Sequence, residues 1–402
     1  MKMNFSSVLR ANYQLRTRVD ENDCHSILIS LLRGMAAIVV ATAHLRAAVY
    51  PSFRAVSDPP VWFNMLAFIC GFAHQAVLIF FVISGWLVGG SLLNRMHERH
   101  AITNYAIDRI TRLWTVLIPT FLVTLLIAIG LGTADPGELG FSPAHPYSAS
   151  AFVGNLIGLQ GIVVPNFGEN FALWSLANET WYYLLFPLLA VALFGQGTFA
   201  RFSCLASLVF LCFMLPSSIV GYFFIWLLGV ASSRFQIECG NGVRWLWVGL
   251  TLMVSVYFRL TGELDAFEMS TLGQDILCSV FYLVLLSSLQ FRASSQSRFV
   301  SLLRKGGRFF AEFSFTLYVL HVPLIGLLRH ISEVQIGLRV LSPSDATHTG
   351  VFFGMLTVLL ASAYLSYLLF ESKTCRVRNV VKNLAKRYRE SRSGQATVST
   401  KG

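Results

Sequence analysis

Two ionisable side chains, Arg33 and His44, lie inside the first long apolar segment of this 402-residue chain. Eleven helical steps of about 100° end only about 20° past three full turns, so both side chains share one face, roughly 16 Å apart along the axis. An arginine can bind an anion, and a neutral imidazole can accept a proton from a hydroxyl group. Two interpretations stay open: a functional pair, or a topology anchor at Arg33 and a packed, hydrogen-bonded histidine at His44.

A second candidate is the pair Arg109 and Arg112, at the start of a later apolar segment. Helical residues three apart share a face, and two neighbouring guanidinium groups suit phosphate recognition. The alternative is that both arginines are cytoplasmic charges that set the orientation of the chain in a membrane.

Aromatic and acidic side chains gather where the fourth long apolar segment begins, at Trp174, Glu179, Trp181 and Tyr182. Aromatic faces and a carboxylate could bind a polar ligand there. The alternative is an aromatic belt at the membrane interface, with Glu179 as a helix-start carboxylate that the helix dipole favours.

The ninth apolar segment carries a further polar group. Tyr318 and His321 are three residues apart on one helix face, Pro323 is expected to kink the helix, and Glu312 lies nearby. Packing explains this group as well as function does. His74 and Asp275 are further polar residues in apolar surroundings, and the sequence assigns them no role.

The amino-acid composition indicates which class of protein carries these side chains. Apolar residues make up 55% of the chain and charged residues only 13%, against about 25% charged in an average soluble domain. These values argue against an ordinary cytosolic enzyme, and they exclude a disordered chain, a collagen and a disulfide scaffold. The seven cysteines lack metal-ligand spacing, so we interpret them as packing residues: Cys24, Cys70, Cys204, Cys212, Cys239, Cys278 and Cys375. The chain is predicted to be an all-α integral membrane protein.

About ten stretches are apolar for the length of a membrane-crossing helix, about 20 residues. The first follows 27 polar and basic residues, so no signal peptide is expected. Residues 151–164 are apolar but interrupted by glycines, which favours a re-entrant or interfacial segment. Only Pro216 and Gly221 separate the fifth stretch from the sixth. The predicted spans are 28–48, 66–93, 111–132, 179–196, 200–216, 218–235, 243–260, 272–291, 310–331 and 350–371.

The distribution of basic residues predicts the orientation. With both termini in the cytoplasm, about 25 of the 31 Lys and Arg residues face inward, whereas Arg54, Arg259 and Arg339 face outward. This asymmetry explains most of the net charge of +11, so nucleic-acid binding is not needed. The predicted organisation is a cytoplasmic segment at 1–27, a membrane domain at 28–371 and a basic cytoplasmic tail at 372–402. The tail is a topology signal or, alternatively, a binder of anionic lipid headgroups.

The longest predicted external loop, 133–178, contains no Lys or Arg and carries Asp135, Glu138 and Glu169. A loop of this length is functional or mobile. Its four prolines argue against regular helix: Pro136, Pro143, Pro146 and Pro165.

Taken in their order along the chain, these motifs resemble those of the acyltransferase-3 family of multi-spanning membrane O-acyltransferases. Members of that family modify bacterial surface polysaccharides, lipopolysaccharide, Nod factors and some antibiotics. The resemblance covers residues 28–371, and five motifs in order make it specific. The matches are Arg33 and His44; Phe80-Phe81-Val82-Ile83-Ser84-Gly85; Arg109 and Arg112; Trp174, Ser175, Leu176, Glu179, Tyr182, Tyr183 and Pro187; and Tyr318, His321 and Pro323.

The chain departs from the family pattern at two places. The segment Ala76-Val77-Leu78-Ile79 lacks an aspartate that often precedes Phe80 in the family, and Glu371-Ser372-Lys373 lacks the proline of the closing Glu-x-Pro motif. No soluble esterase-like domain is expected after the last span. The acyl group would therefore pass directly to the final acceptor or to a separate partner.

The resemblance implies an acyl-CoA donor, most often acetyl-CoA, on the cytoplasmic side, and no permanently bound cofactor or metal. The phosphates of this donor would be held by Arg33, Arg109 and Arg112, and Ser84 and Tyr318 would also lie in the donor site. His44 would be a general base or a covalent acyl carrier, with catalytic roles for Arg33 and Glu179 as well. Glu179 would orient His44, stabilise its charged form or bind the acceptor. The acceptor would contact Trp174, Ser175, Tyr182 and His321.

The implied acceptor is a saccharide or lipid-linked saccharide at the bacterial inner membrane, with membrane lipids and polysaccharide-assembly proteins as further partners. An acyl relay to a separate periplasmic transferase is one alternative. A secondary transporter or flippase is another, because ten spans with sparse internal charges fit that class too. Against the transporter, the sequence has no internal repeat and no paired broken helices.

Overall fold

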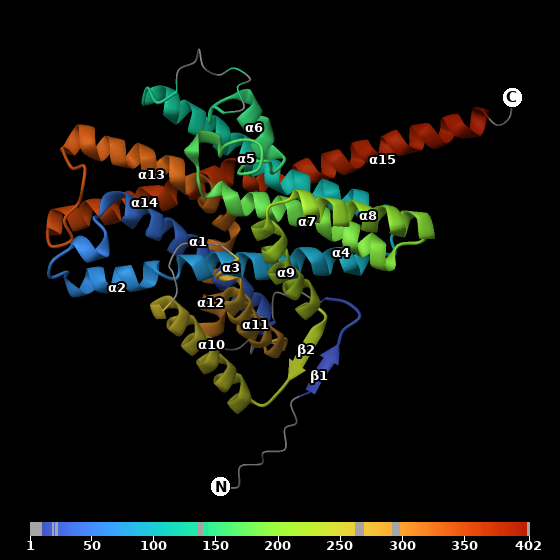
Figure 1. Ribbon diagram of the computed structural model, residues 1–402, viewed down its shortest axis with the longest axis horizontal. Helices are drawn as coiled ribbons and strands as arrows, with labels where there is room; N and C mark the ends of the chain where they lie inside the picture. The colour runs from blue at the N-terminus through green and yellow to red at the C-terminus, as the bar shows by residue number, and fades with distance from the viewer. Residues whose placement is uncertain are drawn as a thin grey trace, which may run out of the picture.

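The computed structural model describes residues 10–17, 20, 23–134, 140, 142, 144–261, 269–291 and 298–399, without the side chains of residue 54 and of 392–399. Within these ranges helices joined by turns and loops make up most of the chain, two short strands form one sheet, and α15 projects from the bundle (Figure 1). The elements are β1 (Arg10–Tyr13), α1 (Cys24–Val49), α2 (Val61–Cys70), α3 (Ala73–Ser84), α4 (Gly90–Arg95), α5 (Ala101–Gly130), α6 (Ala149–Leu156), α7 (Leu173–Phe194), α8 (Thr198–Met214), α9 (Ser217–Ser232), β2 (Phe235–Glu238), α10 (Asn241–Thr261), α11 (Leu272–Ser288), α12 (Arg298–Glu312), α13 (Ser314–Ile336), α14 (Ala346–Leu369) and α15 (Thr374–Ser399).

Seven helical segments within the described residues are long and apolar enough to cross a membrane. Three further apolar helices, α8, α9 and α11, have 17, 16 and 17 residues, fewer than the about 20 that a spanning helix needs. Each of the ten predicted stretches overlaps one of these ten helical segments. The prediction of an all-α membrane protein is therefore confirmed, while the number of crossings stays a prediction.

Contacts between distant segments agree with the predicted order of crossings. The antiparallel pair β1–β2 joins the segment before the first predicted span to the link after the sixth. The Cys24 backbone N–H donates to the Phe291 carbonyl over 2.9 Å, and the Leu341 N–H donates to the Val49 carbonyl over 2.8 Å. In each case the ten-span topology places both segments on one side of the membrane. Which side each terminus faces stays a prediction.

The helix that carries Arg33 and His44 lies at the centre of the bundle. α1 contacts α2, α3, α11, α12, α13 and α14. Two backbone N–H groups of its first turn, those of Cys24 and His25, donate to the carbonyls of Phe291 and Leu289, just beyond the end of α11. Neighbouring helices therefore enclose both polar side chains.

Glycines allow α3 and α9 to touch along their backbones. A Cβ atom at Gly85 would lie 2.0 Å from the Trp226 carbonyl oxygen, and one at Gly229 would lie 2.3 Å from the Val82 oxygen. A π-helical turn at Gly85–Gly89 joins α3 to α4, and such turns are frequent at functional sites. The glycine of the Phe-Phe-x-x-Ser-Gly motif thus has a packing role.

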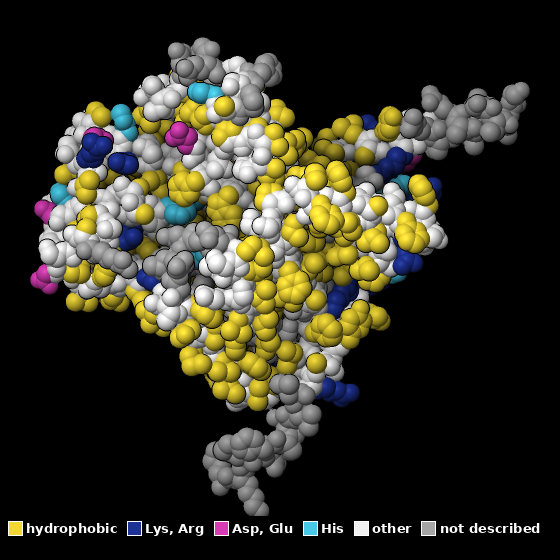
Figure 2. All heavy atoms as spheres, viewed as in Figure 1, with side chains coloured by type: hydrophobic (Ala, Val, Ile, Leu, Met, Phe, Trp, Pro, Cys, Tyr) yellow, Lys and Arg dark blue, Asp and Glu magenta, His cyan; other side chains and the backbone are white. Residues whose placement is uncertain are grey.

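Several outer helix faces expose large apolar side chains. Phe199 and Phe213 on α8 are 88% and 80% exposed, and Trp245 on α10 is 73% exposed. Figure 2 shows hydrophobic side chains over much of this surface. Apolar surface of this extent indicates a face that another apolar phase covers, here the lipid of the membrane.

The structure corrects several predicted boundaries. The ninth predicted stretch, 310–331, spans a break at Phe313 between α12 and α13. α5 begins at Ala101, so Arg109 and Arg112 lie in its third and fourth turns rather than at its start. α7 begins at Leu173, so Glu179 lies in its second turn and is not a helix-start carboxylate.

The predicted external segments are described in part. Residues 151–164 contain the end of the short helix α6 followed by turns, so they do not form a spanning helix. Asp135, Pro136, Glu138 and Pro143, from the acidic loop, lie outside the described residues.

A side-chain cap starts α14. The Asp345 carboxylate accepts hydrogen bonds from the backbone N–H groups of His348 and Thr347, at 3.1 and 2.7 Å. These bonds lower the pKa of the Asp345 carboxyl. An aspartate before the first helical residue is a preferred N-cap, so the sequence determines this boundary locally.

The close approach of α3 and α9 predicts a specific stability effect. Gly85→Ala places a Cβ atom against the Trp226 carbonyl and should destabilise the fold by about 1–3 kcal/mol. Gly249→Ala on α10 is the matched control, because a Cβ atom there meets nothing within 4 Å. Thermal unfolding of both variants in detergent checks this. Equal midpoints for the two would show that the helices do not pack this closely.

Candidate functional site

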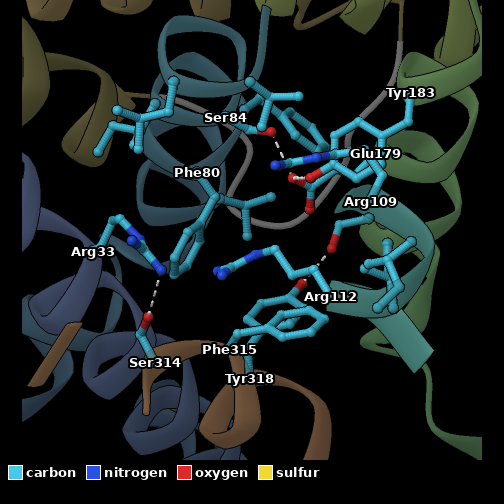
Figure 3. Close-up of a pocket in the computed structure, with 18 of the residues that line it drawn as sticks. Arg33, Phe80, Ser84, Arg109, Arg112, Glu179, Tyr183, Ser314, Phe315 and Tyr318 are labelled. Carbon is cyan, nitrogen blue, oxygen red and sulfur yellow. Dashed lines mark hydrogen bonds between the residues drawn. The ribbon is translucent and has the colours of Figure 1, made fainter. Parts of the chain in front are cut away.

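Predicted site residues from five helices line one cavity of about 250 Å³. We call it the arginine cavity, and Figure 3 shows its labelled side chains converging from α1, α3, α5, α7 and α13. Its lining includes five charged side chains and the hydroxyl-bearing Tyr183. The charged residues are Arg33, Arg109, Arg112, Glu179 and Arg378.

Aromatic rings and a hydroxyl hold the guanidinium groups of the arginine cavity. Arg109 lies over the Tyr183 ring at 5.8 Å, and Arg112 lies over the Phe315 ring at 5.7 Å, both within cation–π range. The Arg33 Nη2 lies 3.5 Å from the Ser314 Oγ. Three cations from two helices thus face one space.

Glu179 is part of the wall of the arginine cavity. Its Oε1 accepts hydrogen bonds from the Ser84 Oγ at 2.5 Å and from the Tyr183 hydroxyl. The Trp226 indole N–H donates to the same Ser84 oxygen over 3.1 Å. This network joins α3, α7 and α9 and explains the serine and the second tyrosine of the sequence motifs.

A second, larger cavity of about 970 Å³ contains the histidine of α1. We call it the histidine cavity, and its polar and aromatic lining includes His44, Arg46, His74, Phe171, Trp174 and Arg259.

One wall is common to the two cavities. Val77 and Tyr318 line both of them. The Tyr318 hydroxyl lies 2.6 Å from the Ser175 Oγ and donates to the Ala172 carbonyl over 3.2 Å. Arg33 and His44 therefore line adjacent cavities, on opposite sides of a wall that Tyr318 helps to form.

The hydrogen-bond partner of His44, His321, determines which nitrogen of the His44 ring is basic. The His321 Nδ1 lies 3.2 Å from the Leu317 carbonyl oxygen, which can only accept, so this nitrogen carries the proton. In a neutral imidazole the His321 Nε2 is then the acceptor, and the His44 Nδ1, 2.7 Å away, is the donor. The lone pair of neutral His44 is consequently on its Nε2.

A histidine–carboxylate pair also lies beside the histidine cavity, through His74 in its lining. The His74 Nε2 lies 2.8 Å from the Asp275 Oδ1, and the Tyr222 hydroxyl donates to Oδ2 over 2.5 Å. The sequence could not join them, because the two residues are 201 positions apart. The pair supports α11 against α3 on the predicted outer side.

The structure divides the predicted site residues between the two cavities. Arg33, Arg109, Arg112, Ser84, Ser175, Glu179 and Tyr318 line the arginine cavity, whereas His44, Trp174 and again Tyr318 line the histidine cavity. His321 lies behind His44 and is wholly buried. No group of three His, Cys, Asp or Glu side chains able to hold a metal occurs within the described ranges.

Tyr182 does not belong to either cavity lining. It is wholly buried and packs against the rings of Phe81, Phe223 and Trp226. Because Tyr182 is buried, it does not form part of an aromatic belt at the membrane interface. Its neighbour Tyr183 lines the arginine cavity instead, because successive helical side chains point about 100° apart.

Sequence reasoning missed one charged residue of the arginine cavity lining. Arg378 comes from α15, in the segment interpreted as a topology signal or a lipid-binding tail. Its place in a run of like charges gave no signal that distinguished it from its neighbours.

The hydrogen-bond chain from Leu317 to His44 predicts one tautomer. In ¹⁵N-histidine NMR spectra of the detergent-solubilised protein, His44 should carry its proton on Nδ1 at a pH where it is neutral. His321→Ala removes the acceptor and should shift His44 towards a mixture of tautomers. His330→Ala, an exposed change on the same helix, is the control. An Nε2-protonated His44 in the wild type would contradict the arrangement.

Comparison with known proteins places the chain in a family. The family model described as an acyltransferase domain, acyltransferase-3, matches residues 27–369. No curated protein and no solved structure matches the chain. The match extends over most of the chain and includes every predicted site residue. The chain therefore belongs to the acyltransferase-3 family of membrane acyltransferases.

Proposed function

We propose that the protein transfers an acyl group from acyl-CoA to a hydroxyl of a saccharide or lipid-linked saccharide. The acyl group that we propose is acetyl. The observation that carries this proposal is the common wall of the two cavities. A cationic space able to hold a phosphorylated donor adjoins a space that contains a basic imidazole, and Tyr318 and Val77 border both.

The arginine cavity supports a donor with several phosphates. Guanidinium groups bind phosphate oxygens in paired hydrogen bonds, and Arg33, Arg109 and Arg112 face the same space. The CoA phosphates would lie among these arginines, and the pantetheine arm would pass Tyr318 towards His44. Glu179 is assigned to this cavity, where it orders Ser84 and Tyr183.

The histidine cavity supports acyl transfer by His44. In the direct route the acceptor hydroxyl attacks the thioester carbon, its proton passes to the His44 Nε2, and the CoA thiolate leaves and recovers that proton. In the two-step route the Nε2 attacks the thioester carbon and CoA leaves as a thiolate. The resulting acyl-imidazolium then acylates the acceptor hydroxyl, whose proton passes to the CoA thiolate, and neutral His44 is regenerated. Both routes need the lone pair on Nε2, so His321 is assigned as a positioning residue.

The acceptor side is proposed from the chemistry of its lining. Trp174 and Phe171 offer aromatic faces beside His44, and such faces suit sugar rings. A surface polysaccharide, or its lipid-linked precursor, at the bacterial inner membrane fits a site inside a multi-pass protein. The acyl relay uses the same His44 chemistry and differs in its final acceptor.

Removing the imidazole should abolish transfer. In inverted membrane vesicles given labelled acetyl-CoA and host glycolipid, His44→Ala should lower label transfer to glycan by at least about 100-fold, because a general base contributes about that much. His97→Ala, an exposed histidine outside both cavities, is the matched control. Wild-type rates in His44→Ala would exclude the catalytic role.

The same assay separates the alternative functions. Release of CoA with label on the protein and none on glycan would favour the relay. Movement of a saccharide across the vesicle membrane, with no histidine-dependent use of acyl-CoA, would favour the transporter.

Removing one phosphate-binding arginine should weaken donor binding. Arg112→Ala should raise the KM for acetyl-CoA about 10-fold, since a hydrogen bond to a charged group contributes about 1.5–3 kcal/mol. Arg201→Ala is the control, because Arg201 is exposed on α8, outside both cavity linings, and donates to the nearby Ala192 carbonyl. An unchanged KM in Arg112→Ala would show that Arg112 does not bind the donor and would favour its alternative role, a cytoplasmic charge that sets the orientation of the chain in the membrane.

A further inference from the structure

The C-terminal helix α15 begins at a fixed corner of the membrane domain. The Glu371 carboxylate accepts a hydrogen bond from the Thr316 hydroxyl of α13 over 2.6 Å, and the Thr374 hydroxyl donates to the Glu371 carbonyl over 2.6 Å. The Thr374 hydroxyl also lies 2.9 Å from the Thr115 hydroxyl of α5. These bonds set the direction in which α15 leaves the bundle, alongside α5 (Figure 1).

A buried carboxylate then holds α15 against α5. Asp108 is only 6% exposed, and its oxygens lie 3.5 Å from the Arg378 Nε, 2.5 Å from the Lys382 Nζ and 3.4 Å from the Arg95 Nη1. Arg378 and Lys382 are one helical turn apart and share a face. Two cations of α15 are thus directed to the helix that carries Arg109 and Arg112.

This arrangement brings Arg378 into the lining of the arginine cavity. Four guanidinium groups therefore face a space whose lining contains one carboxylate, Glu179, within the described residues. The Nε of Arg109 is buried without a hydrogen-bond partner in that part of the chain. Because like charges in a partly apolar wall repel each other, the arrangement favours an anion with several charged groups.

We infer that α15 completes the donor site and that Arg378 binds the 3′-phosphate of CoA. The inference rests on the proposed function and deepens it. The thioester must reach His44 past Tyr318, so the adenosine end of CoA must lie at the opposite end of the arginine cavity. Arg378 is held by Asp108, one turn of α5 before Arg112, in the direction of the predicted cytoplasmic surface.

Binding of CoA and of 3′-dephospho-CoA to the full-length protein in detergent tests the assignment without any acceptor. Arg378→Ala should weaken CoA binding about 10-fold. It should change the affinity for 3′-dephospho-CoA little, because that ligand lacks the group that Arg378 binds. The matched control is Arg376→Ala, which removes the same charge from an exposed position of the same helix outside the cavity.

The outcomes separate this inference from the proposed function. A wild type that binds neither ligand would overturn the acyl-CoA site itself. If the wild type binds CoA and Arg378→Ala binds it equally well, only the role of Arg378 fails. Equal weakening for both ligands, or equal weakening in Arg376→Ala, would overturn the 3′-phosphate assignment. A thermal midpoint matching wild type in both variants establishes that they are folded.

Discussion

The structure depends on one constraint, the cost of placing ionisable side chains inside an apolar bundle. Arg33 and His44 share a face of α1, and α1 is surrounded by six other helices. Such groups are expensive in a membrane unless they face partners or an internal cavity. The helices around α1 meet this condition with two cavities, and Tyr318 and Val77 form the wall between them.

Features that depend on local sequence could be predicted. Long apolar runs placed the principal helices, and the eleven-residue spacing placed Arg33 and His44 on one face. Features that depend on contacts between distant segments could not. The β1–β2 pair joins residues more than 200 positions apart. The break at Phe313 lies between Glu312, the last residue of α12, and Ser314, the first residue of α13, inside a stretch predicted as one span.

The same distinction explains what the sequence could establish about the site. Motif order identified Arg109, Arg112 and Glu179, and the structure brings them into one cavity. Motif order does not say which of two adjacent tyrosines faces that cavity, because the direction of a side chain depends on the helix rotation that packing selects. Arg378 had no distinguishing signal, because its role comes from Asp108, a residue 270 positions away.

The division into two cavities also constrains how catalysis can work. Acyl-CoA and CoA carry the same phosphates, so the donor site proposed in the arginine cavity would bind donor and product through the same groups. Interactions that are equal in the ground state and the transition state lower KM without raising kcat. Acceleration of the proposed transfer must therefore come from the other side of the Tyr318 wall, where His321 directs the lone pair of His44 to Nε2. Changes among the arginines and changes at the histidine pair should consequently affect different kinetic parameters.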